Sequence, residues 1–219
     1  MNVLGMDTST DASAACVLRH DGQHFEVRTD PGSRAHAREL MPAVVEAMDR
    51  SALDWGELEA IAVGIGPGAF TGLRIGIATA RALARATGLQ LRPVSSLAAL
   101  ARGIDAEPAL PLIDARRGEL FVALYDRGEE RWPAFAATPE AVAARVAAEG
   151  TSPLAAGNGS VRFRGVLEAA GIRVEPDGSR AHEVSALHIC ELAAGVPPAP
   201  PEAVLPDYLR LPDAKPRTE

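Results

Sequence analysis

A glycine-rich segment between two regular elements has the residue types best suited to bind a ligand. The run from Ile61 to Ile65 is apolar, and Gly-Pro-Gly follows it at 66–68, before a helical pattern that continues to Gly88. Glycines allow close approach of a ligand or of another backbone, and a helix N-terminus offers free amides to a phosphate. The segment predicts either a nucleotide contact through Gly66 and Gly68, or a tight turn that packs a helix on a strand.

Known phosphate-binding motifs do not match this loop. The sequence has no Gly-Lys-Ser/Thr of a P-loop there, and Arg74 lies inside the following helical pattern instead. The glycines also lack the spacing of a dinucleotide-binding fingerprint. These departures favour the tight turn.

Two carboxylates flank a polar turn near the start of the chain. Asp7 follows an apolar stretch at 3–6, and Asp11 follows four residues later. We expect these carboxylates either to bind a metal, such as the magnesium of a bound nucleotide, or to cap the turn. Because no third oxygen ligand lies nearby in the sequence, turn capping is favoured.

The remaining reactive residue types do not form a recognised catalytic or metal motif. His36 has no second histidine at helical spacing, so we expect an imidazole on a helix surface. His182 and His188 are six residues apart and do not share a helical face, which disfavours zinc. Ser95 and Ser96 lie outside a GxSxG motif and suit a helix cap.

Hydrophobic periodicity predicts alternating strands and helices in the first half of the chain. Ser33 and Thr71 are expected to cap the two long helices, and Pro42 is expected to kink or restart the first. Asp54 and Glu57 have capping-box spacing. The expected elements are strands 3–6, 13–18 and 24–28, helix 33–50, a short helix after 54, strand 61–65, helix 71–87, strand 89–94 and a helix ending near 103.

The second half nearly repeats this order, and each half begins with a strand that ends in aspartate, Asp7 or Asp114. Arg116 and Arg117 fall in a turn, where they face either a phosphate, a partner's carboxylate, or solvent. The expected elements are strands 109–113, 119–125 and 132–136, a helix from 138, strand 154–156, a helix to 171, strand 172–174 and helix 185–194.

Such a pseudo-repeat predicts an α/β protein with two β-β-β-α-β-α-type lobes and a cleft between them. We place the lobes at residues 1–103 and 104–196, followed by a Pro-rich linker and tail at 197–219. Tyr208 and Leu209 are expected to pack the tail back on a lobe.

Composition excludes some functions. The chain has 219 residues, 47% of them hydrophobic, with a net charge of −7, so it lacks the basic balance that a protein needs to bind RNA unaided. Cys16 and Cys190 predict two buried thiols in a reducing compartment. We find no signal peptide and no apolar run long enough to span a membrane, and therefore predict a cytoplasmic protein.

Three motifs, in order along the chain, resemble the TsaB (YeaZ) family of bacterial tRNA modification. They are MDTST at 6–10, GPGAFTGLRIGIATARALA at 66–84 and PDYLR at 206–210. The resemblance implies the actin-like ATPase fold (ASKHA, RNase H-like). It also implies a role in forming N6-threonylcarbamoyladenosine in tRNA next to the anticodon.

The resemblance extends to the catalytic relative TsaD, which carries a metal-binding HxxxH pair. Ser96 and Leu100 stand at those two positions in this sequence. Leucine cannot ligate a metal. The resemblance therefore implies a noncatalytic chain with no metal and no cofactor of its own, with ATP or ADP at an interface within a complex.

The family implies binding to a TsaD-like catalytic subunit through the N-terminal helices, with a TsaE-like ATPase as a further partner. The family also implies that the chain forms a homodimer in the absence of its partners and that it contacts tRNA only as part of the complex. Alternatives are a stand-alone ATPase or phosphotransferase that uses Asp7 and Asp114 or, least favoured, a metalloprotease. The expected interface residues lie on helices 34–50 and 71–87 and are Leu40, Val44, Leu73, Ile77, Ala80 and Ala84.

Overall fold

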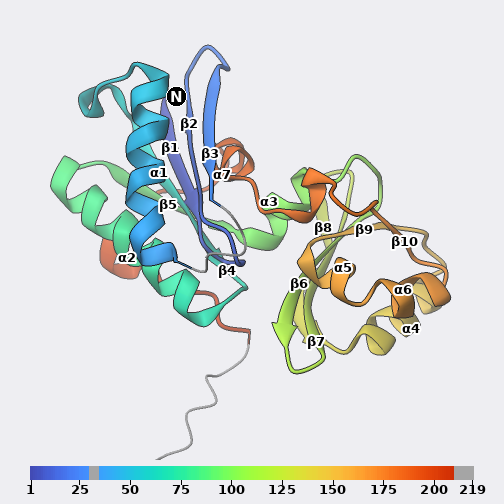
Figure 1. The fold of residues 1–219 in the computed structure, drawn as a ribbon. Helices are drawn as coiled ribbons and strands as arrows, with labels where there is room; N and C mark the ends of the chain where they lie inside the picture. The colour runs from blue at the N-terminus through green and yellow to red at the C-terminus, as the bar shows by residue number, and fades with distance from the viewer. Residues whose placement is uncertain (30–34, 210–219) are drawn as a thin grey trace, which may run out of the picture.

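Two sheets of the same strand order organise the chain in the computed structural model, which describes residues 1–29 and 35–209. The first has the order β3-β2-β1-β4-β5, and the second has the order β8-β7-β6-β9-β10 (Figure 1). The strands are β1 (Val3–Asp7), β2 (Ala14–Leu18), β3 (His24–Arg28), β4 (Ala60–Gly66), β5 (Gln90–Ser95), β6 (Ala109–Arg116), β7 (Glu119–Asp126), β8 (Glu129–Ala137), β9 (Leu154–Ala156) and β10 (Arg173–Val174).

In each sheet the first three strands pair antiparallel, and the first then pairs in parallel with a later strand. The fourth and fifth strands also pair in parallel, as βαβ connections require. This repeat confirms the predicted α/β class and the doubled lobe.

Long helices cover one face of the first sheet: α1 (His36–Ser51) and α2 (Phe70–Thr87). Because side chains alternate across a strand, Leu4 and Met6 of β1 face these helices. They belong to a core, here called the helix-side core, which also takes in residues of β2, β4 and β5. Burial of this apolar face is what positions both helices.

Several predicted details of these helices are corrected. α1 runs through Pro42 as one helix and does not restart there. α2 begins at Phe70 with Ala69 as its N-cap, so Thr71 lies inside the first turn and does not cap it. Ser33 lies outside the described residues. The capping box is present: Asp54 is the N-cap of η1 (Trp55–Glu57), and Glu57 is its third residue.

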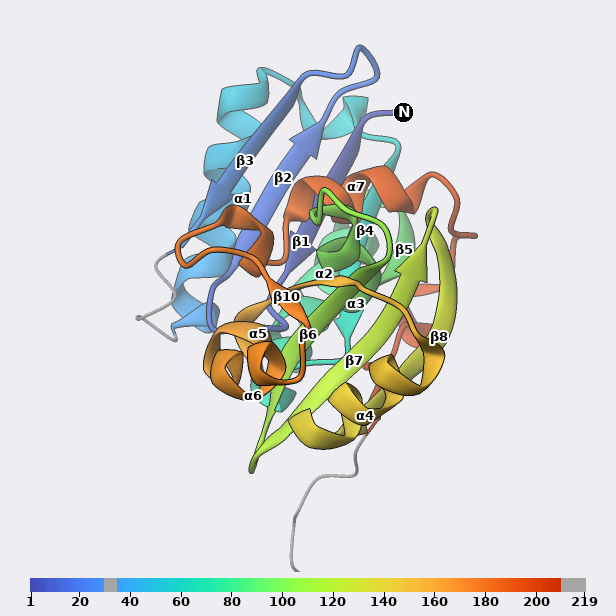
Figure 2. The same ribbon diagram turned by 90° about the vertical axis from the view of Figure 1, so that its right-hand side faces the viewer.

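The other face of the first sheet is covered by α3 (Ser96–Arg102) and α7 (Ala186–Ala193), with Ser95 as the N-cap of α3. Figure 2 shows α7 on the side of the sheet opposite α1. The sequence pattern predicts residues 185–194 in the second lobe. They pack on the first because the apolar stripe of α7 meets β1, where a Cβ atom at Gly5 would collide with Cys190.

An inter-lobe core joins the two lobes. It combines Val3 and Cys16 of the first sheet with Ile113 and Phe121 of the second, together with residues of α3 and α7. Cys16 and Cys190 are both buried free thiols, as predicted, and burial raises the pKa of Cys190.

Shorter helices cover the second sheet: α4 (Pro139–Glu149), α5 (Asn158–Arg162) and α6 (Arg164–Ala169). The single helix expected up to residue 171 is broken at Phe163 into α5 and α6. Two short 3-10 turns follow, η2 (Arg180–His182) and η3 (Pro201–Ala203). No helix among the described residues is long and apolar enough to cross a membrane.

Candidate functional site

A cavity of about 310 Å³ lies between the lobes, at the end of the sheets where β1, β4 and β6 terminate. This volume is at the lower end of the range typical of small-ligand pockets. We call this cavity the cleft. Its walls come from the turn after β1, the start of α2, the β6–β7 hairpin, Asn158 and the chain near its C-terminus, and the lining includes Asp11, Gly68, Phe70, Asp114, Arg116, Arg117, Phe121 and Tyr208.

The first glycine loop is closed by its own chain. Gly66 has φ +108° and its amide donates to Ser96 Oγ over 3.2 Å. A Cβ atom at Gly68 would collide with the backbone of Ser9, whose carbonyl accepts from the Ala69 amide over 2.7 Å. The glycines therefore permit close approach of the chain to itself, which is the tight turn that the sequence favoured. Gly68 lines the cleft, whereas Gly66 does not.

Asp7 is buried beneath this loop and caps the turn. Its Oδ1 accepts from the amide of Ser9 over 2.8 Å and from its hydroxyl over 2.6 Å, and its Oδ2 accepts from Ser96 Oγ over 2.7 Å. A side chain at Gly64 would overlap this carboxylate. Burial raises the pKa of Asp7, against the lowering effect of the Ser9 and Ser96 hydrogen bonds. The carboxylate does not line the cleft, so its predicted nucleotide contact gains no support here.

Asp114, the counterpart in the second lobe, is held by arginines. Its side chain is 6% exposed and pairs with Arg116 at 3.2 Å and with Arg162 at 2.7 Å. Asn158 accepts from the Asp114 amide over 2.9 Å. Arg116 also pairs with Asp11 at 2.9 Å across the cleft. Of the alternatives for Arg116, the structure therefore shows a carboxylate partner within the same chain.

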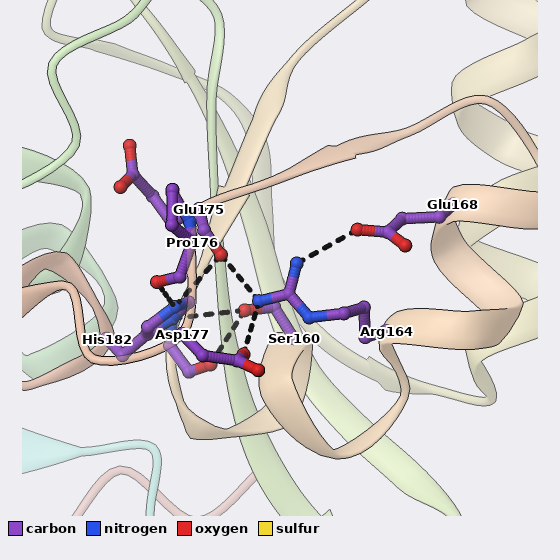
Figure 3. Close-up of polar contacts among 8 residues, drawn as sticks. Ser160, Arg164, Glu168, Glu175, Pro176, Asp177 and His182 are labelled. Atoms are coloured by element: carbon purple, nitrogen blue, oxygen red, sulfur yellow. Dashed lines mark hydrogen bonds and ion pairs between the residues drawn. The ribbon is translucent and has the colours of Figure 1, made fainter.

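A second glycine loop, Gly157-Asn158-Gly159 after β9, is fixed by a buried histidine (Figure 3). The Gly157 amide donates to Nδ1 of His182 over 3.2 Å, so the ring hydrogen lies on Nε2, near the carbonyls of Glu175 and Pro176. Ser160 Oγ donates to the Gly157 carbonyl over 2.7 Å. His182 thus joins the 175–182 segment to the loop and has a structural role.

Two further histidines, His36 and His188, are also structural. His36 is buried, with Nδ1 2.9 Å from Ser13 Oγ, so the expected surface imidazole is wrong. It points inward because it begins α1 on the face that packs on the sheet. Nδ1 of His188 lies 3.1 Å from the Ala99 carbonyl, and burial lowers the pKa of His188. Within residues 1–29 and 35–209, no group of three or more His, Cys, Asp or Glu side chains is placed to hold a metal ion.

The six residues expected at a partner interface face the interior of the first lobe. Each is at most 3% exposed, because the apolar stripes of α1 and α2 pack on the sheet rather than on a partner. This corrects the choice of residues, while the use of the two helices as an interface stays a prediction. The buried set is Leu40, Val44, Leu73, Ile77, Ala80 and Ala84.

The outward face of the same helices carries other side chains. Met41 is 38% exposed and Val45 is 47% exposed on α1, and alanines at positions 78 and 82 are exposed on α2. Residues selected by helical periodicity are those of the buried stripe. A surface site needs the opposite stripe, which the periodicity also locates.

Comparison with known proteins gives consistent matches. A family model described as "TsaD: tRNA N6-adenosine threonylcarbamoyltransferase" matches residues 30–158. The chain is 38% identical over 136 residues to the tRNA threonylcarbamoyladenosine biosynthesis protein TsaB of Escherichia coli, covering 59% of this chain and 57% of that protein. It is 42% identical over 127 residues to an uncharacterized protein of Mycobacterium tuberculosis, covering 58% and 60%. The chain therefore matches about 60% of the length of these curated relatives.

Solved structures match over nearly the whole chain. YeaZ from Pseudomonas aeruginosa has a TM-score of 0.76 at 30% identity, with 94% of this chain and 99% of that chain covered. A ROK hexokinase from Thermus thermophilus, at 15% identity and a TM-score of 0.53, covers 89% and 99% and shares the fold alone. By its sequence motifs, its doubled lobe and these matches, the chain belongs to the TsaB (YeaZ) family, which has the actin-like ATPase fold.

Proposed function

We propose that this chain is the noncatalytic partner subunit of the cytoplasmic complex that forms N6-threonylcarbamoyladenosine in tRNA next to the anticodon. It binds and activates a TsaD-like catalytic subunit, a TsaE-like ATPase joins them, and tRNA is contacted through the complex. Membership of the TsaB family carries the proposal.

The core around α3 supports a noncatalytic role. Ser96 stands at the first of the two positions that resemble the metal pair of TsaD, and its hydroxyl already donates to Asp7 and accepts from Gly66. Leu100, at the second, is 1% exposed in the inter-lobe core. Both positions therefore stabilise the fold, and leucine has no atom that could hold a metal.

The outward face of α1 and α2 is the surface that we propose for the partner. Figure 1 shows the two helices side by side on the outside of the first lobe. The exposed Met41 and Val45 supply apolar area, and the exposed alanines of α2 permit close helix approach. In the absence of the partner, the same face would join two copies of this chain.

We propose that this chain binds no nucleotide alone and that ATP or ADP binds at an interface of the complex. The closed first glycine loop supports this, since its close contacts are with Ser9. Calorimetric titration of ATP into the chain, with and without the catalytic subunit, tests it. Heat of binding from the chain alone, abolished by Asp7→Asn, would favour the alternative of a stand-alone ATPase or phosphotransferase.

Co-purification with a TsaD-like subunit tests the interface. Ala78→Arg places a long cation on the exposed face of α2, and we expect it to abolish both co-purification and tRNA modification, with normal thermal unfolding of the free chain. Ala144→Arg is the matched control, since it changes an exposed alanine on α4 of the other lobe. Full binding and modification by Ala78→Arg would contradict the proposed interface.

A further inference from the structure

The chain after α7 runs along the first lobe as a segment that includes η3, residues 197–209, here called the strap (red in Figure 1). The Ala199 amide donates to the Leu91 carbonyl over 2.8 Å, on the edge strand β5. Val204 is 2% exposed and packs in the helix-side core. The Asp207 amide then donates to the Ile65 carbonyl over 2.8 Å. The strap is thus anchored along its length, most deeply at Val204.

The end of the strap is clamped on α2. The Tyr208 ring stacks on Phe70, with ring centroids 5.1 Å apart and planes inclined by 27°. Arg74 Nε donates to the Tyr208 hydroxyl over 3.0 Å, while the guanidinium lies 3.8 Å from the centre of the Phe70 ring. Phe70 is 36% exposed, so this clamp lies at the surface, unlike the Val204 anchor.

Beyond the clamp, the strap forms one wall of the cleft. Asp207, Tyr208 and Leu209 line it, and Leu209 packs against the inter-lobe core. Ile113 and Phe121 of the second lobe also line the cleft, and both belong to the core that Leu209 packs against. The strap therefore covers an apolar part of the cleft that would otherwise be open.

We propose that residues 205–209 are a lid on the cleft, hinged at Val204 and fastened by Phe70, Arg74 and Tyr208. The anchors differ in place. Displacing Val204 exposes the helix-side core of the first lobe. Opening residues 205–209 instead breaks a ring stack, one side-chain hydrogen bond and the Asp207 amide bond, and moves the partly buried Leu209 off the inter-lobe core. The end of the strap opens while the first lobe stays folded, and opening uncovers Ile113 and Phe121.

Under the proposed function, on which this step rests, the lid is connected to partner binding. Arg74 is exposed and lies one helical turn from Ala78, on the same outward stripe of α2. A partner carboxylate or carbonyl that accepts from Nε of Arg74 competes with the Tyr208 hydroxyl for that donor. Binding on that stripe therefore releases the clamp and opens the cleft.

Amide hydrogen exchange of the full chain, measured by NMR, tests the lid without any partner. In Tyr208→Ala we expect the exchange rate of the Asp207 amide to rise about 10- to 100-fold, because a stack and a hydrogen bond are lost. In Arg74→Gln we expect a rise of about 3- to 10-fold. The Ala199 amide should keep its wild-type rate in both variants.

Two matched controls separate the clamp from a general loosening. Leu205→Ala changes a side chain on the same strap that is 62% exposed, and Arg85→Gln changes an exposed arginine in the last turn of α2. Both should leave the Asp207 rate unchanged. Fluorescence of 8-anilinonaphthalene-1-sulfonate, which reports exposed apolar surface, should increase with Tyr208→Ala and not with Leu205→Ala.

An unchanged Asp207 rate in both clamp variants would overturn the lid. An equal rise in the exchange rate of the Ala199 amide would also overturn the lid. The whole strap would then detach from the first lobe as one unit, and Val204 would not act as a hinge. Since these measurements use the free chain, their failure leaves the proposed partner interface standing. Conversely, if the co-purification test contradicts the proposed interface, the lid still stands, but its connection to partner binding is removed.

Discussion

The two lobes share one strand order but differ in their helices. In the first lobe α1 and α2 have 16 and 18 residues, whereas the helices on the second sheet have 11, 5 and 6. A helix needs only two or three turns to cover the short strands seen here. The extra length in the first lobe gives an outward face that the sheet does not require, which is why we place the partner there.

The lobes also differ in how they hold the aspartate at or near the end of the first strand. Asp7 accepts hydrogen bonds from Ser9 and Ser96 and is sealed under Gly64, while Asp114 pairs with Arg116 and Arg162. Equal positions in a repeated fold therefore differ in electrostatics. The first is a buried cap that accepts hydrogen bonds from an amide and two hydroxyls, and the second is part of an ion-pair network that reaches across the cleft.

The largest effect should come from the buried stripe of the first lobe. Leu40→Ala removes a side chain that is 1% exposed in the helix-side core, and we expect it to lower the free energy of unfolding by about 2–5 kcal/mol. Val45→Ala, on the outward face of the same helix, should cost less than about 0.5 kcal/mol. Urea unfolding measures both, and similar costs would contradict the distinction between a core face and a partner face.

Glycine substitutions test the close packing of the first loop. Gly64→Ala forces a methyl group against the Asp7 carboxylate, and we expect a loss of about 2–3 kcal/mol in the free energy of unfolding. Gly165→Ala, in α6 of the second lobe, has open space around the new methyl group and should be neutral or stabilising. A tolerated Gly64→Ala in thermal unfolding would show that Asp7 is not sealed in place.

Much of this contrast is predictable from the sequence. Hydrophobic alternation located the strands, and the recurrence of a strand ending in aspartate predicted the doubled lobe that the sheets confirm. The tight turn at Gly66–Gly68 was favoured because the motif lacks a phosphate-binding lysine. These features are determined by residues that are close together in the sequence, so a local sequence pattern is enough to predict them.

Features that join distant segments were not predictable. Nothing in the spacing of Arg74 and Tyr208, which are 134 residues apart, indicates that they form a hydrogen bond. The placement of α7 on the first sheet depends on the empty space above Gly5. The partner residues were wrongly chosen because periodicity identifies an apolar stripe without saying whether a sheet or another protein covers it.

The ion pairs of the second lobe should have an intermediate effect. Asp114→Asn removes the charge that Arg116 and Arg162 share, and because both arginines are about half exposed we expect a loss of about 1–2 kcal/mol at low salt. In 1 M salt the loss should shrink. Asp126→Asn, whose partner Arg131 is 60% exposed, should cost less than about 0.5 kcal/mol. Equal costs for the two variants would mean that the burial of Asp114 adds nothing.

The smallest effect, and the most diagnostic, concerns Asp7. Its pKa in the folded chain is raised above 3.8 by burial, so the folded state binds a proton more tightly than the unfolded state does. The stability from this group is therefore fully present below pH 3.8 and is lost as the pH rises through the folded pKa.

Asn at this position still accepts from Ser9 and cannot ionise. Asp7→Asn should therefore gain stability relative to wild type between pH 4 and pH 7, as measured by urea unfolding at several pH values. A difference between Asp7→Asn and wild type that stays constant with pH would show that the Asp7 carboxylate is solvated. That result would remove the electrostatic contrast between the two lobes.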